Sequence, residues 1–181
     1  IENADIVALD TNISQKSFEW VCDNYHKPIM VRAITDAKAT RILSRLNCID
    51  TLVLDTAESQ ALTGICAVDE RSAVQCAKAL LKRGVKRVFV NSGREGVAYG
   101  ILGEGIAFYP VPLRRVQRMI VSRGNGSEGA KAVGNDNGSS DTATAALIYA
   151  RYNHFDNSKT GRFAVAAAAL NMESVEAVHE A

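Results

Sequence analysis

The chain has 181 residues, of which 47% are hydrophobic, and its 21 Lys and Arg against 20 Asp and Glu leave a formal net charge of +1. This length and composition predict a single domain over residues 1–181 with its own core, and the balanced charge argues against nucleic acid or an anionic membrane as the main partner. The apolar runs are too short to cross a bilayer, and four cysteines without CxxC spacing indicate reduced thiols in a cytoplasmic (intracellular) protein.

Apolar, strand-like runs alternate with amphipathic, helix-like runs through the first half of the chain. This alternation predicts an α/β fold with a mainly parallel sheet and helices on both faces. An antiparallel hairpin joined by Gly103-Glu104 is expected at the sheet edge. The expected strands are residues 5–9, 28–31, 51–54 and 86–91 and the hairpin arms 97–102 and 105–109; the expected helices are 14–24, 37–46, 56–63 with Gly64 as C-cap, and 69–84.

Glycines and polar residues fill the segment 122–137. This composition predicts a long, flexible loop, for which plain disorder and a flap over a phosphate site are equally compatible interpretations. Residues 142–152 then form an alanine-rich helical pattern. A last helix is expected at residues 161–170, with Ser158 as its cap.

The stretch Asn137-Gly138-Ser139-Ser140-Asp141 directly precedes the alanine-rich helix. A helix start presents backbone N–H groups and a positive dipole end, which favour a bound anion. Small residues let a phosphate approach the backbone, and an Asp in the first turn can accept a proton from a hydroxyl that attacks the phosphate. Ordinary helix capping by Asn, Ser and Asp is the alternative interpretation.

Four further sequence patterns stand out: residues 8–14 (ALDTNIS), Thr51-Leu52 with Ala61-Leu62-Thr63-Gly64, Asp55-Thr56-Ala57-Glu58, and Ser92-Gly93-Arg94-Glu95-Gly96. Together with Gly138-Ser139-Ser140-Asp141, these motifs resemble the carboxy-terminal half of the ribokinase-like (PfkB) sugar and nucleoside kinases, most of all the pseudouridine kinase branch. In that family the corresponding motifs are Gly-Ala-Gly-Asp, Asn-x-x-Glu and a Gly-x-x-Gly turn beside the nucleotide. The resemblance implies a three-layer ribokinase-like fold.

The resemblance also implies an activity, namely ATP-dependent phosphorylation of the primary hydroxyl of a sugar or nucleoside. Asp141 would be the catalytic base. The amides of Gly138, Ser139 and Ser140 would face the charge that develops on the transferred group.

The same resemblance implies residues that hold the cofactors, ATP and Mg²⁺, and possible positions for K⁺. Glu58 and Asp55 would lie on the Mg²⁺ side, Glu58 acting through water; the alternative is that Glu58 is an exposed residue on a short helix. Ser92, Gly93 and Gly96 would line the nucleotide, or would only form a tight turn. Asn171 and Ser174 would approach the adenine or a monovalent-cation loop.

Three departures from the family pattern keep a second function open. Ser139 and Ser140 replace Ala and Gly, Asp55 replaces Asn, and Arg32-Ala33 replaces a common Asp-Pro. Asp55 adds a negative charge that would either favour a metal or repel a triphosphate. The alternative is therefore a non-catalytic or degenerate PfkB-like module that binds a nucleotide or a partner within a longer protein.

The family's sugar-holding residues and lid come mainly from an amino-terminal part, which the resemblance does not find here. We therefore expect a missing amino-terminal domain, a homo-oligomer, or both, and an inactive chain when it is tested alone. A Rossmann-type dinucleotide enzyme is disfavoured, because no Gly-x-Gly-x-x-Gly follows the first expected strand.

Overall fold

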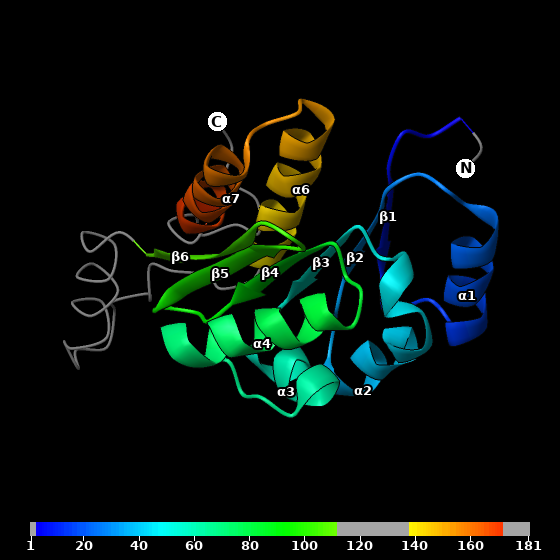
Figure 1. Ribbon diagram of the computed structural model, residues 1–181, viewed down its shortest axis with the longest axis horizontal. Helices are drawn as coiled ribbons and strands as arrows, with labels where there is room; N and C mark the ends of the chain where they lie inside the picture. The colour runs from blue at the N-terminus through cyan, green and yellow to red at the C-terminus, as the bar shows by residue number, and fades with distance from the viewer. Residues whose placement is uncertain (1–2, 112–137, 172–181) are drawn as a thin grey trace, which may run out of the picture. The chain divides into compact units, whose positions relative to one another are not determined.

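The computed structural model describes residues 3–111 and 138–171 (Figure 1). The chain divides into two compact units, residues 1–109 and 110–181, and each is described here by itself. The predicted loop at 122–137 and the predicted site residue Ser174 lie outside the described residues. Within the described part, no helix has the length and apolar character needed to span a membrane.

The first unit contains a six-stranded mixed sheet with its strands in sequence order, β1-β2-β3-β4-β5-β6. Strands β1 to β4 are parallel, β5 is antiparallel to β4, and β6 lies beside β5 after the short turn at residues 102–104. This arrangement confirms the mainly parallel sheet and the terminal hairpin predicted from the sequence. The strands are Val7–Asp10, Ile29–Arg32, Thr51–Leu54, Arg87–Asn91, Gly96–Ile101 and Gly105–Pro110.

Helices of the first unit connect the parallel strands. Helix α3 and helix α4 lie along the same face of the sheet (Figure 1), and Leu52, Leu54, Val88 and Leu80 share the buried apolar core that forms there. Such β-α connections place helices against a parallel sheet because both apolar faces must leave water. The helices are α1 (Gln15–Asn24), α2 (Asp36–Ala39), the 3₁₀ helix η1 (Thr40–Cys48), α3 (Thr56–Thr63) and α4 (Glu70–Lys82).

The single helix expected at residues 37–46 is wrong in one respect, because the segment is α2 followed by η1. Ala39, at the end of α2, and Ile42, in η1, are both buried. Arg45, with φ −137° and ψ 34°, interrupts the helical geometry before Leu46 returns to the core. The apolar spacing fits α and 3₁₀ winding equally well, so the pattern could not separate them.

In the described part of the second unit, helices α6 (Ser139–Tyr152) and α7 (Asn157–Asn171) pack against each other. Helix α6 begins three residues before the expected start at Thr142, because Gly138 is its N-cap with φ 84°. Helix α7 begins at Asn157 rather than Gly161. Asp156 accepts a hydrogen bond from the Lys159 amide at 2.8 Å, so Asp156, and not the expected Ser158, caps α7.

Candidate functional site

The carboxyl ends of three neighbouring parallel strands carry polar side chains. Arg32 ends β2, Asp55 directly follows β3, and Asn91 ends β4. The strand register pairs Arg32 with Val53 and Leu54 with Val90, so the three side chains start from the same edge of the sheet. In open α/β sheets this edge is where ligands bind. It is therefore the candidate site of the first unit.

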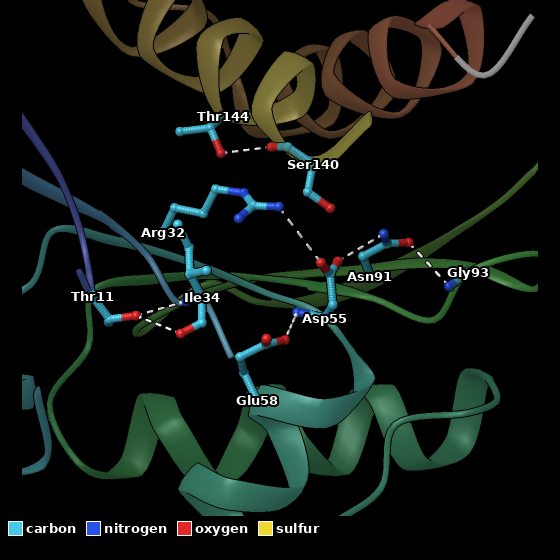
Figure 2. A network of polar contacts seen from close by, with 9 residues as sticks. All are labelled: Thr11, Arg32, Ile34, Asp55, Glu58, Asn91, Gly93, Ser140 and Thr144. Atoms are coloured by element: carbon cyan, nitrogen blue, oxygen red, sulfur yellow. Dashed lines mark hydrogen bonds and ion pairs between the residues drawn. The ribbon is translucent and has the colours of Figure 1, made fainter. Parts of the chain in front are cut away.

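Asp55 is the centre of this group (Figure 2). Its Oδ1 accepts a hydrogen bond from Asn91 Nδ2 at 2.9 Å, and its Oδ2 lies 3.8 Å from Arg32 Nη2. Asn91 Oδ1 in turn accepts from the Gly93 amide at 3.0 Å. The contacts connect the ends of three strands to the β4–β5 turn, although the residues are far apart in sequence.

Glu58 is part of the same arrangement through the start of α3. Its side chain is only 7% exposed, and Oε2 accepts a hydrogen bond from the Asp55 amide at 3.1 Å. This is the returning half of a capping box, which stabilises a helix start. The interpretation of Glu58 as an exposed surface residue is therefore wrong, while its magnesium role stays a prediction.

The β4–β5 turn holds the predicted nucleotide-side residues Ser92, Gly93 and Gly96. The Ser92 amide donates to the Gly96 carbonyl at 2.9 Å and closes the turn, and Gly93 is exposed at its tip. The Ser92 side chain is buried, and its hydroxyl has no hydrogen-bond partner among the described residues. The turn interpretation of these residues is thus confirmed, and contact with a nucleotide stays a prediction.

The start of α6 holds the predicted residues of the second unit. Ser139 and Ser140 are buried in its first turn, and Asp141 is exposed beside them. The first intrahelical hydrogen bond runs from the Thr142 amide to the Gly138 carbonyl at 2.8 Å, and Thr144 Oγ1 donates to the Ser140 carbonyl at 2.7 Å. The motif therefore forms a helix N-terminus with a carboxylate in its first turn.

Metal and adenine sites have less direct support. Among the described residues, no group of three or more His, Cys, Asp and Glu side chains is placed to hold a metal ion. Mg²⁺ in kinase sites often needs only one or two carboxylates, with water and phosphate completing its shell, so Glu58 remains compatible with that role. Asn171 is buried at the end of α7, and its expected approach to adenine stays a prediction.

Sequence reasoning missed the parts that Arg32 and Asn91 play. From the sequence, Arg32 is only a departure from a family pattern, and Asn91 is only the end of a strand. A polar residue that ends a buried parallel strand is a usable signal, because neighbouring strand ends share one edge of the sheet. The partner of each side chain, however, depends on which strands are neighbours.

The chain belongs to the pfkB family of carbohydrate kinases, whose sequence model matches residues 1–118. The pseudouridine kinase of Escherichia coli (strain K12) is 30% identical over 106 residues, which are 58% of this chain and 34% of that protein. These matches confirm the family predicted from the motifs. The matched family region includes Asp55, Glu58 and the β4–β5 turn and ends before Gly138–Asp141.

Solved structures extend the likeness to nearly the whole chain. A putative sugar kinase from Clostridium perfringens has a TM-score of 0.78 at 19% identity, over 98% of this chain and 51% of that one. A ribokinase from Arabidopsis thaliana, complexed with ribose and ATP, has a TM-score of 0.70 at 25% identity, over 97% and 52%. The predicted ribokinase-like α/β fold is confirmed. The chain spans about half the length of these solved relatives.

Proposed function

We propose that the protein transfers the γ-phosphoryl group of ATP to the primary hydroxyl of a sugar or nucleoside. Family membership supports a kinase, and the ribokinase relative is known with ribose and ATP. The observation that carries the proposal is the start of α6, where Asp141 is exposed in the first turn of a helix that opens at Gly138. A helix start favours an anion, and the carboxylate supplies a base beside it.

Gly138, Ser139 and Ser140 have distinct parts in this proposal. The positive φ of Gly138 turns the chain into α6 without steric strain, so the backbone of the first turn can approach a phosphoryl group. The amides and the N-terminal dipole of α6 stabilise negative charge there. Asp141 accepts the proton of the acceptor hydroxyl at its carboxylate as that oxygen attacks.

The first unit offers residues for the nucleotide and its metal. Glu58 fits the shell of Mg²⁺ through water, because it is a nearly buried carboxylate at the carboxyl edge of the sheet. The β4–β5 turn, with the buried Ser92 hydroxyl, fits a phosphate chain. When bound, Mg·ATP supplies the phosphoryl group and offsets its charge. Asn171 and Ser174 are assigned to the adenine or a K⁺ loop.

The acceptor is proposed from the relatives. Pseudouridine is the first candidate because of the 30% identical pseudouridine kinase, and ribose is the second because of the ribokinase. We assign the protein to the cytoplasm, where such metabolites are found, and we assign completion of the acceptor pocket to a further domain or a second copy. A non-catalytic module remains the rival, because Asp55 and Glu58 both stabilise the start of α3 and its surroundings.

The proposal is tested by measuring ADP formation with Mg·ATP and either pseudouridine, ribose or adenosine, in the longest natural polypeptide that contains this sequence. We expect one of these acceptors to be converted to its phosphate ester, identified by mass spectrometry. A polypeptide that binds Mg·ATP but phosphorylates none of them would favour the non-catalytic module.

A second measurement addresses the anion site alone. Crystals soaked in sulfate or a nonhydrolysable ATP analogue are expected to show an oxyanion at the start of α6. An anion bound elsewhere, with the first turn of α6 covered by another segment, would contradict the roles given to Gly138, Ser139 and Ser140.

A further inference from the structure

The ion pair between Arg32 and Asp55 joins two residues that each depart from the family pattern. Arg32 Nη2 lies 3.8 Å from Asp55 Oδ2, and the side chains are 18% and 37% exposed (Figure 2). The pair is therefore partly shielded from water, so its electrostatic interaction is stronger than that of a fully solvated pair. The two departures from the family pattern are therefore in direct electrostatic contact.

The pair also adjoins the β4–β5 turn. Asp55 Oδ1 accepts from Asn91 Nδ2 at 2.9 Å, and Asn91 Oδ1 accepts from the Gly93 amide at 3.0 Å. The Asn91 side chain thus connects Asp55 directly to the turn that is proposed to bind the phosphates. A negative charge at this place raises the local electrostatic cost of any polyphosphate that binds along the turn.

We propose that Arg32 is a positioning residue that offsets the charge of Asp55 and thereby lets a polyphosphate bind beside the β4–β5 turn. The proposal rests on the proposed function for its ligand, a nucleoside di- or triphosphate. Asp55 keeps its contact with Asn91, and Arg32 removes the repulsion that the carboxylate would otherwise exert. Asp55 alone would weaken an anion site here, and the Arg32 charge preserves it.

This proposal predicts that a second substitution, at Asp55, restores the phosphate binding that a first substitution, at Arg32, weakens. Arg32→Met removes the positive charge and leaves the carboxylate, so it should weaken phosphate binding. Asp55→Asn removes the negative charge but keeps an oxygen that accepts from Asn91 and a good N-cap for α3. Adding Asp55→Asn to Arg32→Met should therefore restore phosphate binding. If the two substitutions instead damaged the structure independently, the double variant would show the sum of both losses in binding free energy.

The experiment is calorimetric titration of the chain with Mg·ATP, Mg·ADP and uncharged adenosine at low ionic strength. Arg32→Met is expected to weaken both nucleotides by about three- to tenfold and adenosine by less than about twofold. Arg32→Lys keeps the charge and should bind nearly as the wild type does. The difference between variants should shrink as salt is raised, because salt screens the charges.

The matched control is Arg45→Met, which removes the same charge from a different ion pair. Arg45 Nε lies 3.5 Å from Asp23 Oδ1, and the Arg45 side chain is 41% exposed. This variant has the same net charge as Arg32→Met, and we expect no change in nucleotide affinity. An equal loss in both variants would assign the effect to overall charge and overturn the proposal.

The remaining outcomes separate this inference from the proposed function. A wild type that binds nucleotides, with Arg32→Met unchanged or with adenosine weakened as much as ATP, would overturn the inference alone. Failure of Asp55→Asn to restore binding in the double variant, despite the same melting temperature as the wild type, would also overturn it. A wild type that binds neither nucleotide nor adenosine would overturn the proposed function and, with it, the ligand named here.

Discussion

Asp141 and Asp156 are both acidic residues at the start of a helix in the second unit, yet only one is assigned to chemistry. Asp156 lies at the N-cap of α7, where its side chain accepts a hydrogen bond from the Lys159 amide. Asp141 lies inside the first turn of α6, after Gly138 and two serines. The carboxylate of Asp156 serves as a helix cap, whereas the role proposed for Asp141 is to accept the proton of an acceptor hydroxyl. The two residues therefore form a natural comparison.

Asp141→Asn is expected to slow phosphoryl transfer by on the order of 10²–10⁴, the usual contribution of a positioned base. ATP affinity should change little, because Asn preserves the size of the side chain. The measurement is kcat and nucleotide affinity in the longest natural polypeptide. Asp156→Asn is the control, since Asn also caps helices, and it should retain the rate. Equal rates in both variants would exclude Asp141 as the base.

The four cysteines differ in burial, and their reactivity should differ accordingly. Burial, with Cys48 nearby, raises the pKa of Cys22 to about 12, and burial raises the pKa of Cys76 to about 11. Cys66 is exposed. Because the thiolate is the nucleophile, raised pKa values keep Cys22 and Cys76 protonated and slow to react at about pH 8.

Iodoacetamide at about pH 8 should therefore alkylate Cys66 first and leave Cys22 and Cys76 unmodified in the folded chain. Labelling of the two buried thiols should appear only as the pH approaches their raised pKa values or when the chain unfolds. Peptide mapping by mass spectrometry gives the order. Early modification of Cys22 would contradict the packing of α1 that buries it.

At the scale of an element, the start of α3 combines a structural and a catalytic assignment on Glu58. The buried carboxylate accepts a hydrogen bond from the Asp55 amide at 3.1 Å. A neutral side chain of the same length that ends in an oxygen can accept the same hydrogen bond. A magnesium role, by contrast, depends on the negative charge. Two substitutions separate these contributions.

Glu58→Gln should keep most of the stability and raise the Mg²⁺ concentration needed for half-maximal rate in the longest natural polypeptide. Glu58→Ala should also lower the free energy of unfolding by about 1–3 kcal/mol, because a buried amide loses its acceptor. Urea unfolding and magnesium titrations measure the two effects. Unchanged magnesium dependence in Glu58→Gln would return Glu58 to a purely structural role.

The end of α4 gives a test of packing that is independent of function. Gly84 has φ 96°, and a Cβ at this position would lie 2.9 Å from the Cβ of Asn47. Gly64, at the end of α3, has φ 75° and no atom within 4 Å of such a Cβ. Both sites strain an alanine backbone, but only Gly84 adds a steric clash.

Gly84→Ala is therefore expected to lower the free energy of unfolding by about 2–4 kcal/mol, and Gly64→Ala by about 1 kcal/mol. Chemical denaturation of the two variants under the same conditions measures the difference. Similar losses at both sites would mean that the Asn47 segment moves away without cost.

At the scale of the whole molecule, the share of each relative that is matched bears on activity. The chain matches 34% of the curated pseudouridine kinase and 51% of the solved sugar kinase. Phosphoryl transfer requires donor, metal and acceptor to be held together, and catalysis consists mostly of that positioning. The residues assigned here concern the donor, the metal and the base.

This chain alone is therefore expected to bind Mg·ATP weakly and to phosphorylate sugars or nucleosides at a negligible rate. Calorimetry on the chain, with a coupled assay on both the chain and the longest natural polypeptide, tests this expectation. Robust turnover by the chain alone would show that its own residues complete the acceptor pocket.

Local sequence determined the order and type of most elements of this protein. The strand at Thr51–Leu54 and the helix at Thr56–Thr63 were predicted with their observed bounds. Apolar periodicity, turn residues and caps act over a few neighbouring positions, so they are legible in the sequence. The motifs between residues 8 and 96, together with Gly138-Ser139-Ser140-Asp141, predicted the family, and the family model matches residues 1–118, which contain all of these motifs but the last.

Tertiary structure alone decided which side chains meet. Asn91 donates to Asp55 across 36 positions of the sequence, and Arg32 reaches Asp55 from the neighbouring strand. The two family departures, interpreted separately from the sequence, become an ion pair only because β2 and β3 are parallel neighbours in register. Likewise, Asp156 rather than Ser158 caps α7, since capping depends on the backbone geometry at the helix start and not on residue type alone. Contacts between distant residues follow from strand order and packing, which no local pattern specifies.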